Sequence, residues 1–426
     1  MTRPRVDLAS ALMLPGLMAA LALAVVAALG LQPAEVLGDL AAGGASYVLR
    51  TVAAGAIVVG AAGGVLGSFA VTRRQSLLGD AVSHAALPGI FLVFMAWSAA
   101  GLSGAAFAGR HLPEARSLPV VLVGALAAGL VATAMILTAA RLTRLKEDAA
   151  LAVTLSSFFG LGIVLRSYLQ THPGRFGNRA GLEAFLYGST STMSRDDVLA
   201  MAAVTGVAVL AVVVLWKELK LLAFDPDYLA TLGYPVRALD ILLTGLIVAA
   251  VIVGLQMVGV ILMSALLIAP AVGARQWTDD FARLVGLAVV FGAASGLVGV
   301  VASSARANVA TGPIIAVYAL GLALASLALA PNRGLAWRAV RQARQRRRFQ
   351  VDTLVLHLDG HAAAPTRADL AAQLGWAPGL SAAVVDRAAA AGLVAPADGR
   401  VALTTAGHAH VRAVLADLAG AAGQAP

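Results

Sequence analysis

The sequence predicts an all-α polytopic membrane protein with about nine or ten transmembrane helices, some of them broken, followed by a small cytoplasmic domain. Of its 426 residues, 60% are hydrophobic and only 12% are charged, and the mean hydropathy is +0.85. Apolar stretches of about twenty residues recur along the chain, and each is long enough to cross a bilayer as a helix. Soluble proteins do not combine these properties, so we place the chain in a membrane.

The apolar stretches before residue 217 predict successive spans at residues 11–31, 48–72, 80–99, 118–140, 149–170 and 198–216. The first is expected to be retained, because no clear cleavage site of small residues follows it. Short basic loops at 73–74 and 141–146 indicate the cytoplasmic side, and the longer loops at 98–118 and 171–197 fall on the other side. The net charge of +9 is therefore explained by membrane topology, and we do not expect nucleic acid as a partner.

An apolar run at 241–273 is too long for one span and short for two. Two more spans are expected at 284–301 and 309–329, before a stretch at 331–349 with seven arginines and no acidic residue. Because that stretch should start in the cytoplasm, the run must cross twice or dip and return as broken helices. Its interruptions are expected at Gly254, Gly259 and Pro270. The candidates in this region for lining the pathway or its outer gate are Gln256, Met257, Met263 and Ser264.

One segment places ionisable groups inside an otherwise apolar part of the chain. Asp80 and His84 are four residues apart, so in a helix they lie one turn apart on the same face. An acid near the membrane centre costs about 2.5 kcal/mol or more, and such groups are usually paired and functional. The pair therefore predicts a ligand site. The alternative is structural, with Asp80 as a helix cap and His84 as a packing histidine whose hydrogen bonds are satisfied.

This segment, from Phe69 to Gly89, contains the pattern aromatic-x-x-x-Arg-x-x-Ser-Leu-x-Gly-Asp-Ala-x-Ser-His-Ala-x-x-Pro-Gly. It resembles the permease subunits of ABC-type importers for manganese, zinc and iron, the ABC-3 metal permeases. Further blocks at 258–271 and 311–313 resemble the same family, and the resemblance covers roughly residues 45–330. It implies that Asp80 and His84 coordinate the transported metal ion at the centre of the pathway. Because the chain has no cysteine, only His, Asp, Glu, Met or backbone oxygen could hold such an ion.

A charged, amphipathic insertion follows residue 216 on the predicted cytoplasmic side. The pattern alone fits an ordinary solvated loop equally well. The segment resembles the coupling segment of the family, which docks in a groove of the ATPase subunit. The resemblance gives that role to Phe224, Asp225, Pro226, Tyr228, Leu229 and Gly233.

The chain contains no Gly-x-x-x-x-Gly-Lys-Ser/Thr motif, so we do not expect it to hydrolyse ATP or to be an enzyme. The resemblance implies three protein partners besides membrane lipid: a separate ABC ATPase, a metal-binding solute-binding protein, and a second permease chain of the same or a related kind. No permanently bound cofactor is expected, because the metal ion is cargo.

The composition predicts a transmembrane domain at 1–330, a basic linker at 331–349, a soluble domain at 350–416 and a tail at 417–426. In the soluble domain, a capped helix from Thr366 and a second helix at 381–391 precede a hairpin with an Asp-Gly turn. This order is typical of a winged helix-turn-helix, and it resembles the DNA-binding half of diphtheria-toxin-repressor-type metal regulators. The second helix carries a single arginine, so contact with the ATPase or a neighbouring permease is a simpler expectation than DNA reading.

We therefore expect a permease subunit of a divalent-metal ABC importer in the bacterial inner membrane, with its C-terminal domain in the cytoplasm. Manganese is preferred, because the soluble domain resembles manganese-responsive regulators, while zinc and iron stay open. Two alternatives remain. One is a secondary transporter driven by a proton or sodium gradient, with Asp80 as the proton site. The other is a membrane-anchored metal sensor that signals through its soluble domain.

Overall fold

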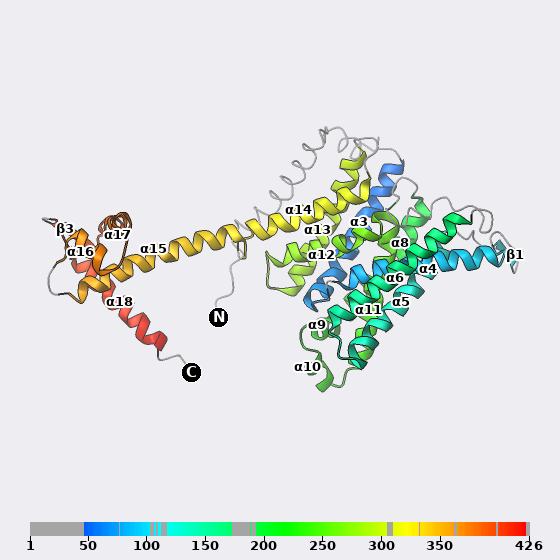
Figure 1. Ribbon diagram of the computed structural model, residues 1–426, viewed down its shortest axis with the longest axis horizontal. Coiled ribbons are helices and arrows are strands. Elements are labelled where there is room, and N and C mark those ends of the chain that lie inside the picture. Colours follow the sequence, from blue (N-terminus) through cyan, green and yellow to red (C-terminus); the bar gives the residue numbers. More distant parts are fainter. Residues whose placement is uncertain are drawn as a thin grey trace. The chain divides into compact units, whose positions relative to one another are not determined.

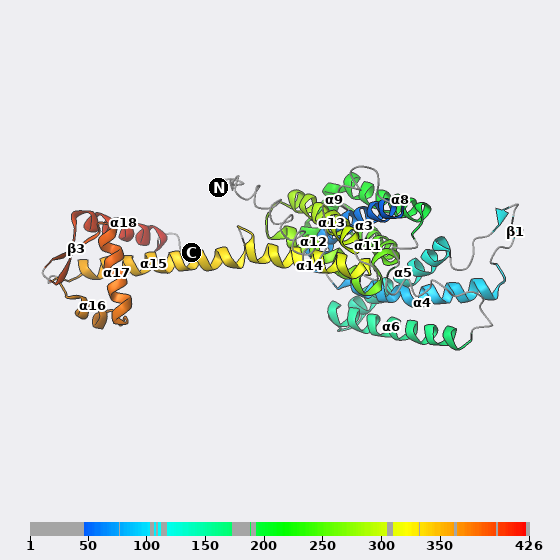
Figure 2. The same cartoon turned by 90° about the horizontal axis from the view of Figure 1, so that it is seen from above.

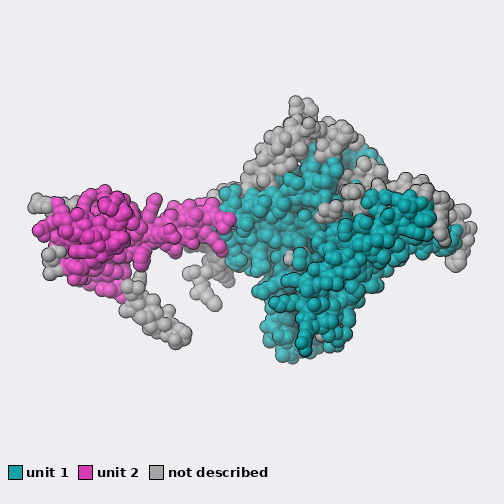
Figure 3. All heavy atoms as spheres, viewed as in Figure 1, with its two compact units in different colours: residues 1–334 teal, residues 335–426 magenta. Residues whose placement is uncertain are grey.

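The computed structural model describes residues 47–75, 77–102, 106–107, 110–111, 117–172, 188, 193–304, 310–331, 333–361, 364–397 and 399–422. It divides into two compact units, Met1–Gly334 and Leu335–Pro426, which are described separately below (Figure 3). The span predicted at 11–31 lies outside the described residues.

Unit 1 is a bundle of helices (Figure 1). Its helices are α3 (Tyr47–Thr72), α4 (Leu78–Ala99), α5 (Leu118–Leu142), α6 (Glu147–Thr171), α8 (Arg195–Val214), α9 (Trp216–Phe224), α10 (Pro226–Thr231), α11 (Val236–Val258), α12 (Val260–Arg275), α13 (Phe281–Ser304) and α14 (Thr311–Leu329). Within the described part of the chain, 8 of them are long and apolar enough to cross a membrane: α3, α4, α5, α6, α8, α11, α13 and α14. A short antiparallel hairpin, β1 (Ala106–Phe107) and β2 (Arg110–His111), follows α4.

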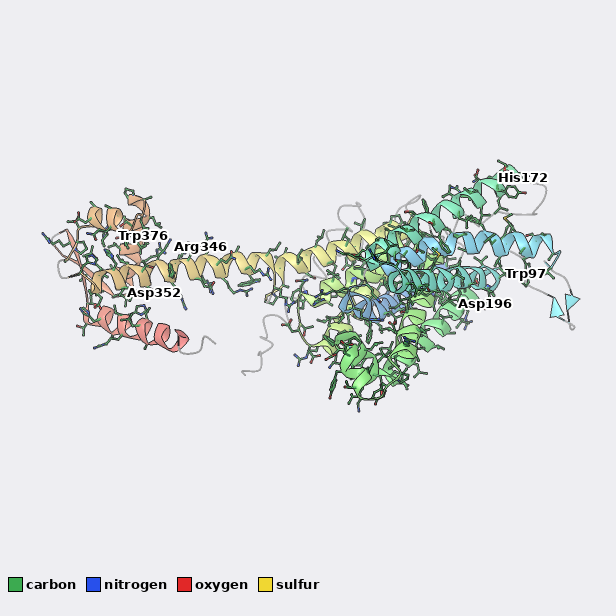
Figure 4. The ribbon with its side chains drawn as sticks, turned by 60° about the horizontal axis from the view of Figure 1, so that its bottom comes forward. Trp97, His172, Asp196, Arg346, Asp352 and Trp376 are labelled. Carbon is green, nitrogen blue, oxygen red and sulfur yellow. The ribbon has the colours of Figure 1, made fainter. Side chains whose placement is uncertain are left out.

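Helix α3 lies at the centre of this bundle, beside α12 and α13 in both Figures 1 and 2. Within the most apolar stretch of α3, 78% is buried inside the protein. The corresponding shares are 22% for α6 and 28% for α8, so these two helices are peripheral. Figure 4 shows Trp97, His172 and Asp196 at the same end of the unit. The C-terminal ends of α4 and α6 therefore meet the N-terminal end of α8 on one side of the bundle, as the alternation of the predicted loops requires.

Helices α3 and α13 cross with their backbones almost in contact. A Cβ built on Gly60 would lie 2.2 Å from the carbonyl oxygen of Gly292, and one built on Gly292 would lie 2.0 Å from that of Gly60. The contact repeats one turn along, where a Cβ on Gly64 would lie 2.4 Å from the carbonyl oxygen of Ala288. In a membrane, where lipid is as apolar as leucine, such close approach is a main source of helix association.

We expect Gly292→Ala to destabilise the bundle by about 1–3 kcal/mol, because the added methyl group must push α3 and α13 apart. The matched control is Gly286→Ala on the same helix, where a Cβ would meet nothing within 4 Å. Thermal unfolding of the two purified variants in the same detergent measures the difference. Equal melting temperatures for the two variants would contradict the close-packed crossing.

The apolar run at 241–273 is broken at Gly259, one of the three predicted interruptions. This residue has φ +88°, ends α11 and begins α12. Gly254 lies inside α11 and Pro270 inside α12, so neither interrupts a helix. The break is enclosed by protein, because a Cβ on Gly312 at the start of α14 would lie 2.6 Å from the carbonyl oxygen of Val258. Exposed polar backbone is tolerated at membrane depth only in such surroundings.

Unit 2 consists of α15 (Leu335–Asp359), α16 (Arg367–Gln373), α17 (Pro378–Ala390), the antiparallel strands β3 (Val394–Ala397) and β4 (Arg400–Leu403), and α18 (Thr405–Ala422). Its small core is aliphatic and contains Leu354, Leu358, Leu370, Val384, Val385, Ala388, Val394 and Val401.

The predicted cap of α16 is present. The Thr366 hydroxyl accepts a hydrogen bond from the Asp369 backbone N–H, and the Asp369 carboxylate accepts hydrogen bonds from the hydroxyl and the backbone N–H of Thr366. The hydrogen bond from the Thr366 hydroxyl, followed by that from its backbone, lowers the pKa of Asp369. Helix α17 begins three residues before the predicted start at 381, because Pro378 is suited to the first turn of a helix.

Candidate functional site

Asp80 and His84 lie on α4 with their side chains facing one another. The distance from His84 Nε2 to Asp80 Oδ1 is 3.5 Å, and the side chains are 15% and 34% exposed respectively. Asp80 is in the first turn of the helix, where the helix dipole stabilises a carboxylate. The helical spacing that the sequence predicts for this pair is therefore present.

The structural alternative for this pair is wrong about Asp80. Helix α4 begins at Leu78, so its N-cap is Leu77, and Asp80 lies inside the helix and not at its cap. His84 directs its Nε2 at Asp80, while its Nδ1 is buried without a hydrogen-bond partner among the described residues. Buried polar atoms without partners are uncommon in proteins, and a bound ion or an ordered water molecule is a usual explanation for one.

Two neighbouring helices complete the surroundings of the pair. The Ser264 hydroxyl on α12 lies near the Asp80 carboxylate. Phe159 on α6 packs edge-on against the His84 ring, with ring centroids 4.9 Å apart. Among the residues that the structure describes, no group of three or more His, Cys, Asp or Glu side chains could hold a metal ion. The described part of the chain therefore brings two potential metal ligands, Asp80 and His84, to this position.

The four candidate pathway residues are not placed alike. Ser264 is beside Asp80, whereas Met257 and Met263 are fully buried in the helix core. The Met263 sulfur would lie 2.3 Å from a Cβ on Gly254, so this side chain fills the space above that glycine. Gln256 lies on α11, and its side chain is outside the described side chains. Both methionine side chains therefore pack against other residues of this chain.

The turn before α4 is joined to α11 by an ion pair between Arg73 and Asp240. Both side chains are largely buried, at 14% and 13% exposed, so Arg73 is not the freely solvated loop residue that its sequence position indicates. Loss of either partner would leave a buried charge unpaired, which typically costs several kcal/mol. The pair therefore holds the start of the Asp80 helix against α11. Sequence reasoning did not find it, although Asp240 is an isolated acid at the start of an apolar run.

The predicted coupling segment forms two short helices, α9 and α10. Phe224 and Tyr228 are 59% and 52% exposed, and Leu232 and Tyr234 beside them are also exposed. Leu229 is fully buried, so its side chain supports the segment from below. The remaining predicted residues shape the backbone. Asp225 accepts a hydrogen bond from the Tyr228 backbone N–H at 2.9 Å, Pro226 is the first residue of α10, and Gly233 has φ +83°.

An aromatic cluster connects this segment to the bundle. The Phe281 ring at the start of α13 contacts Phe224 and Phe69, with ring centroids 5.4 and 5.0 Å apart, and it stacks on Trp216 at 5.6 Å. Asp280, next to Phe281, accepts backbone hydrogen bonds from Arg283 and Ala282, which lower the pKa of its carboxyl. Phe69 is the aromatic residue that opens the Asp80 motif. The cluster therefore forms a continuous packed contact between α9 and α3.

A family model described as the ABC 3 transport family matches residues 45–330. The chain is 42% identical over 305 residues to the manganese transport system membrane protein MntC of Bacillus subtilis, covering 72% of this chain and 66% of that protein. It is 42% identical over 298 residues to the zinc transport system membrane protein TroC of Treponema pallidum, covering 70% and 94% respectively. Among solved structures, PsaBC from Streptococcus pneumoniae in complex with Fab is similar, with a TM-score of 0.59 and 29% identity over 71% of this chain and 98% of that one.

Proposed function

The chain belongs to the ABC 3 transport family, and on this premise we propose that it is the permease subunit of an ATP-driven importer for a divalent transition-metal ion. In this proposal the ion is coordinated by Asp80 and His84 on its way through the membrane. The observation that carries the assignment is the His84 Nε2, which faces the Asp80 carboxylate at 3.5 Å in an otherwise apolar helix, so that both groups can bind one ion placed between them. A transition metal accepts donors of both kinds.

The cargo is manganese, with zinc and ferrous iron as alternatives. One carboxylate and one imidazole suit all three ions, and a site without thiolate does not favour the softer metals. Two relatives at equal identity are named for manganese and for zinc, so similarity alone does not separate these ions. The preference for manganese rests on the resemblance of unit 2 to manganese-responsive regulators.

A second permease chain completes the site. Two donors hold a transition metal weakly, whereas four or more ligands are usual for these ions. Asp80 remains 34% exposed in the single chain, which leaves it accessible to such a partner. A second copy, or a related permease, would then present its own donors from the opposite side. The resulting site would be strong enough to strip water from the ion and open enough to release it.

The energy comes from a separate ABC ATPase that docks on the surface formed by Phe224 and Tyr228. Exposed aromatic side chains next to a well-packed base are typical of residues that dominate a protein interface. Leu229 and Gly233, which the resemblance includes in this contact, support it indirectly through burial and backbone conformation. A solute-binding protein delivers the ion at the opposite end of the bundle, where α4 and α6 end.

Unit 2 is a winged-helix-like domain in the cytoplasm, and the protein is a multi-pass protein of the bacterial inner membrane. The order of α16, α17 and the β3–β4 hairpin supports the winged-helix assignment. The arginines at 331–349 support a cytoplasmic position, because positive charge concentrates on that side. The partner of unit 2 is another subunit of the importer and not nucleic acid, because α17 carries only Arg387 for direct base reading.

The test is uptake of manganese, zinc and ferrous iron, each supplied alone, in cells that express this chain with its ATPase and its binding protein. We expect uptake of one ion that disappears when the ATPase is inactivated in its own phosphate-binding loop. A secondary transporter would continue to import without ATP hydrolysis. A sensor would import nothing, and removal of residues 350–426 would abolish its signal, whereas a transporter without these residues should retain uptake.

A further inference from the structure

Helix α15 has a packed half and a bare half. Leu354, Val355 and Leu358 are buried in unit 2, whereas every residue from 335 to 349 is exposed. Figure 3 shows this stretch as a single bare helix within the magenta unit, and Figure 4 labels Arg346 on it. The bare half therefore has no buried residue that would anchor it in a core.

The charge of the bare half works against an isolated helix. Residues 335–349 contain six arginines and no acidic residue. Arg344 and Arg348 are four apart, so like charges face each other along the helix and repel. A helix of about fifteen residues without packing is marginal in water even with a favourable sequence. A surface of negative charge would remove the repulsion and stabilise the helix.

The position in the chain indicates which surface this is. The last candidate span, α14, ends at Leu329 and α15 begins at Leu335, so only residues 330–334 separate them. Five extended residues reach about 18 Å at most, so the bare half starts near the membrane surface. Leu335, Trp337 and Val340 in its first two turns are 57%, 37% and 41% exposed. Tryptophan is enriched at the membrane interface, where an apolar ring and basic side chains are both accommodated.

We propose that residues 335–349 of α15 bind anionic phospholipid headgroups at the membrane surface. The arginines contact the phosphates, and the apolar side chains of the first turns enter the headgroup region. Each arginine near an anionic surface strengthens binding roughly fivefold. The binding depends on the membrane location of the chain and not on the transported ion.

Because the chain has no cysteine, a single label can be attached to the full-length protein at Gln345→Cys. The labelled protein is placed in nanodiscs of phosphatidylcholine, with or without about one-third phosphatidylglycerol, and exposed to the neutral quencher acrylamide. We expect protection only in the anionic discs, with loss of protection at high salt. Changing Arg346, Arg347 and Arg348 together to glutamine should weaken binding roughly a hundredfold and expose the label. The matched triple lysine variant should keep it protected.

A label at Ala413→Cys, an exposed position on α18, is the control for unit 2 and should be quenched equally in both discs. Equal quenching of the Gln345→Cys label in both discs would overturn the proposal. So would protection that the glutamine variant retains. Protection in phosphatidylcholine discs on addition of duplex DNA, stronger than that given by the anionic lipid, would instead identify the bare half as a nucleic-acid contact.

Discussion

Asp80→Asn is expected to lower metal uptake at least about 100-fold, while the protein still reaches the membrane and assembles with its ATPase. Asparagine keeps the size of the side chain, but it removes the negative charge that would bind the cation. His84→Ala should have an effect of similar size, because it removes the only other strong donor that the described part of the chain brings to this site. Uptake of radioactive manganese, zinc and iron by cells with matched expression measures both losses.

The control for these variants is His172→Ala. His172 follows α6 at the end of the bundle, where its ring is exposed and lies against Tyr168. Its loss should leave uptake near the wild-type rate. Wild-type uptake by Asp80→Asn would show that the pair is not the transport site, even if the protein is a metal permease. Loss of uptake in the His172 variant as well would point to delivery of the ion and not to coordination.

Tyr228→Ala is expected to weaken binding of the ATPase by about 2 kcal/mol or more, which is roughly thirtyfold in affinity. The side chain is 52% exposed on α10, and only its backbone N–H takes part in the cap formed by Asp225. The substitution should therefore remove an interface contact and leave the fold intact. Co-purification of the ATPase with the permease, followed by a titration of the two components in detergent, measures the affinity.

Two further variants separate docking from folding. Tyr168→Ala removes a tyrosine near the end of α6, away from the coupling segment, and should not change ATPase binding. Leu229→Ala should also reduce assembly, but through unfolding of the segment, since loss of a fully buried leucine typically costs 2–5 kcal/mol. Unchanged ATPase affinity of the Tyr228 variant would show that α10 is not the docking surface.

Hydropathy alone predicted most spans closely. The stretches expected at 48–72 and 118–140 correspond to Tyr47–Thr72 and Leu118–Leu142. Of the three interruptions expected in the run at 241–273, only Gly259 breaks the helix, with a positive φ that separates α11 from α12. The spans are local features, because a run of apolar residues is sufficient for a membrane helix, whereas a glycine permits a break without requiring one, as Gly254 inside α11 shows.

The Asp80–His84 site was partly predictable. A spacing of four residues places the two side chains on one face of a helix, and their presence in an apolar segment indicates a function. The sequence could not distinguish a cap from a ligand, because that depends on where the helix starts. It also could not show that His84 Nδ1 has no partner among the described residues, or that Ser264, distant in the sequence, is beside Asp80.

The sequence by itself determined that this is a membrane protein, where its helices run, and which family it resembles. Only the tertiary structure decided which side of each helix is buried, so that Leu229 is a core residue while Tyr228 is exposed, and Arg73 is paired with Asp240. The physical reason is that lipid and protein interior are both apolar. A membrane helix therefore lacks the polar face that marks solvent in soluble proteins, and its contacts depend on close fit at small residues such as Gly60 and Gly292.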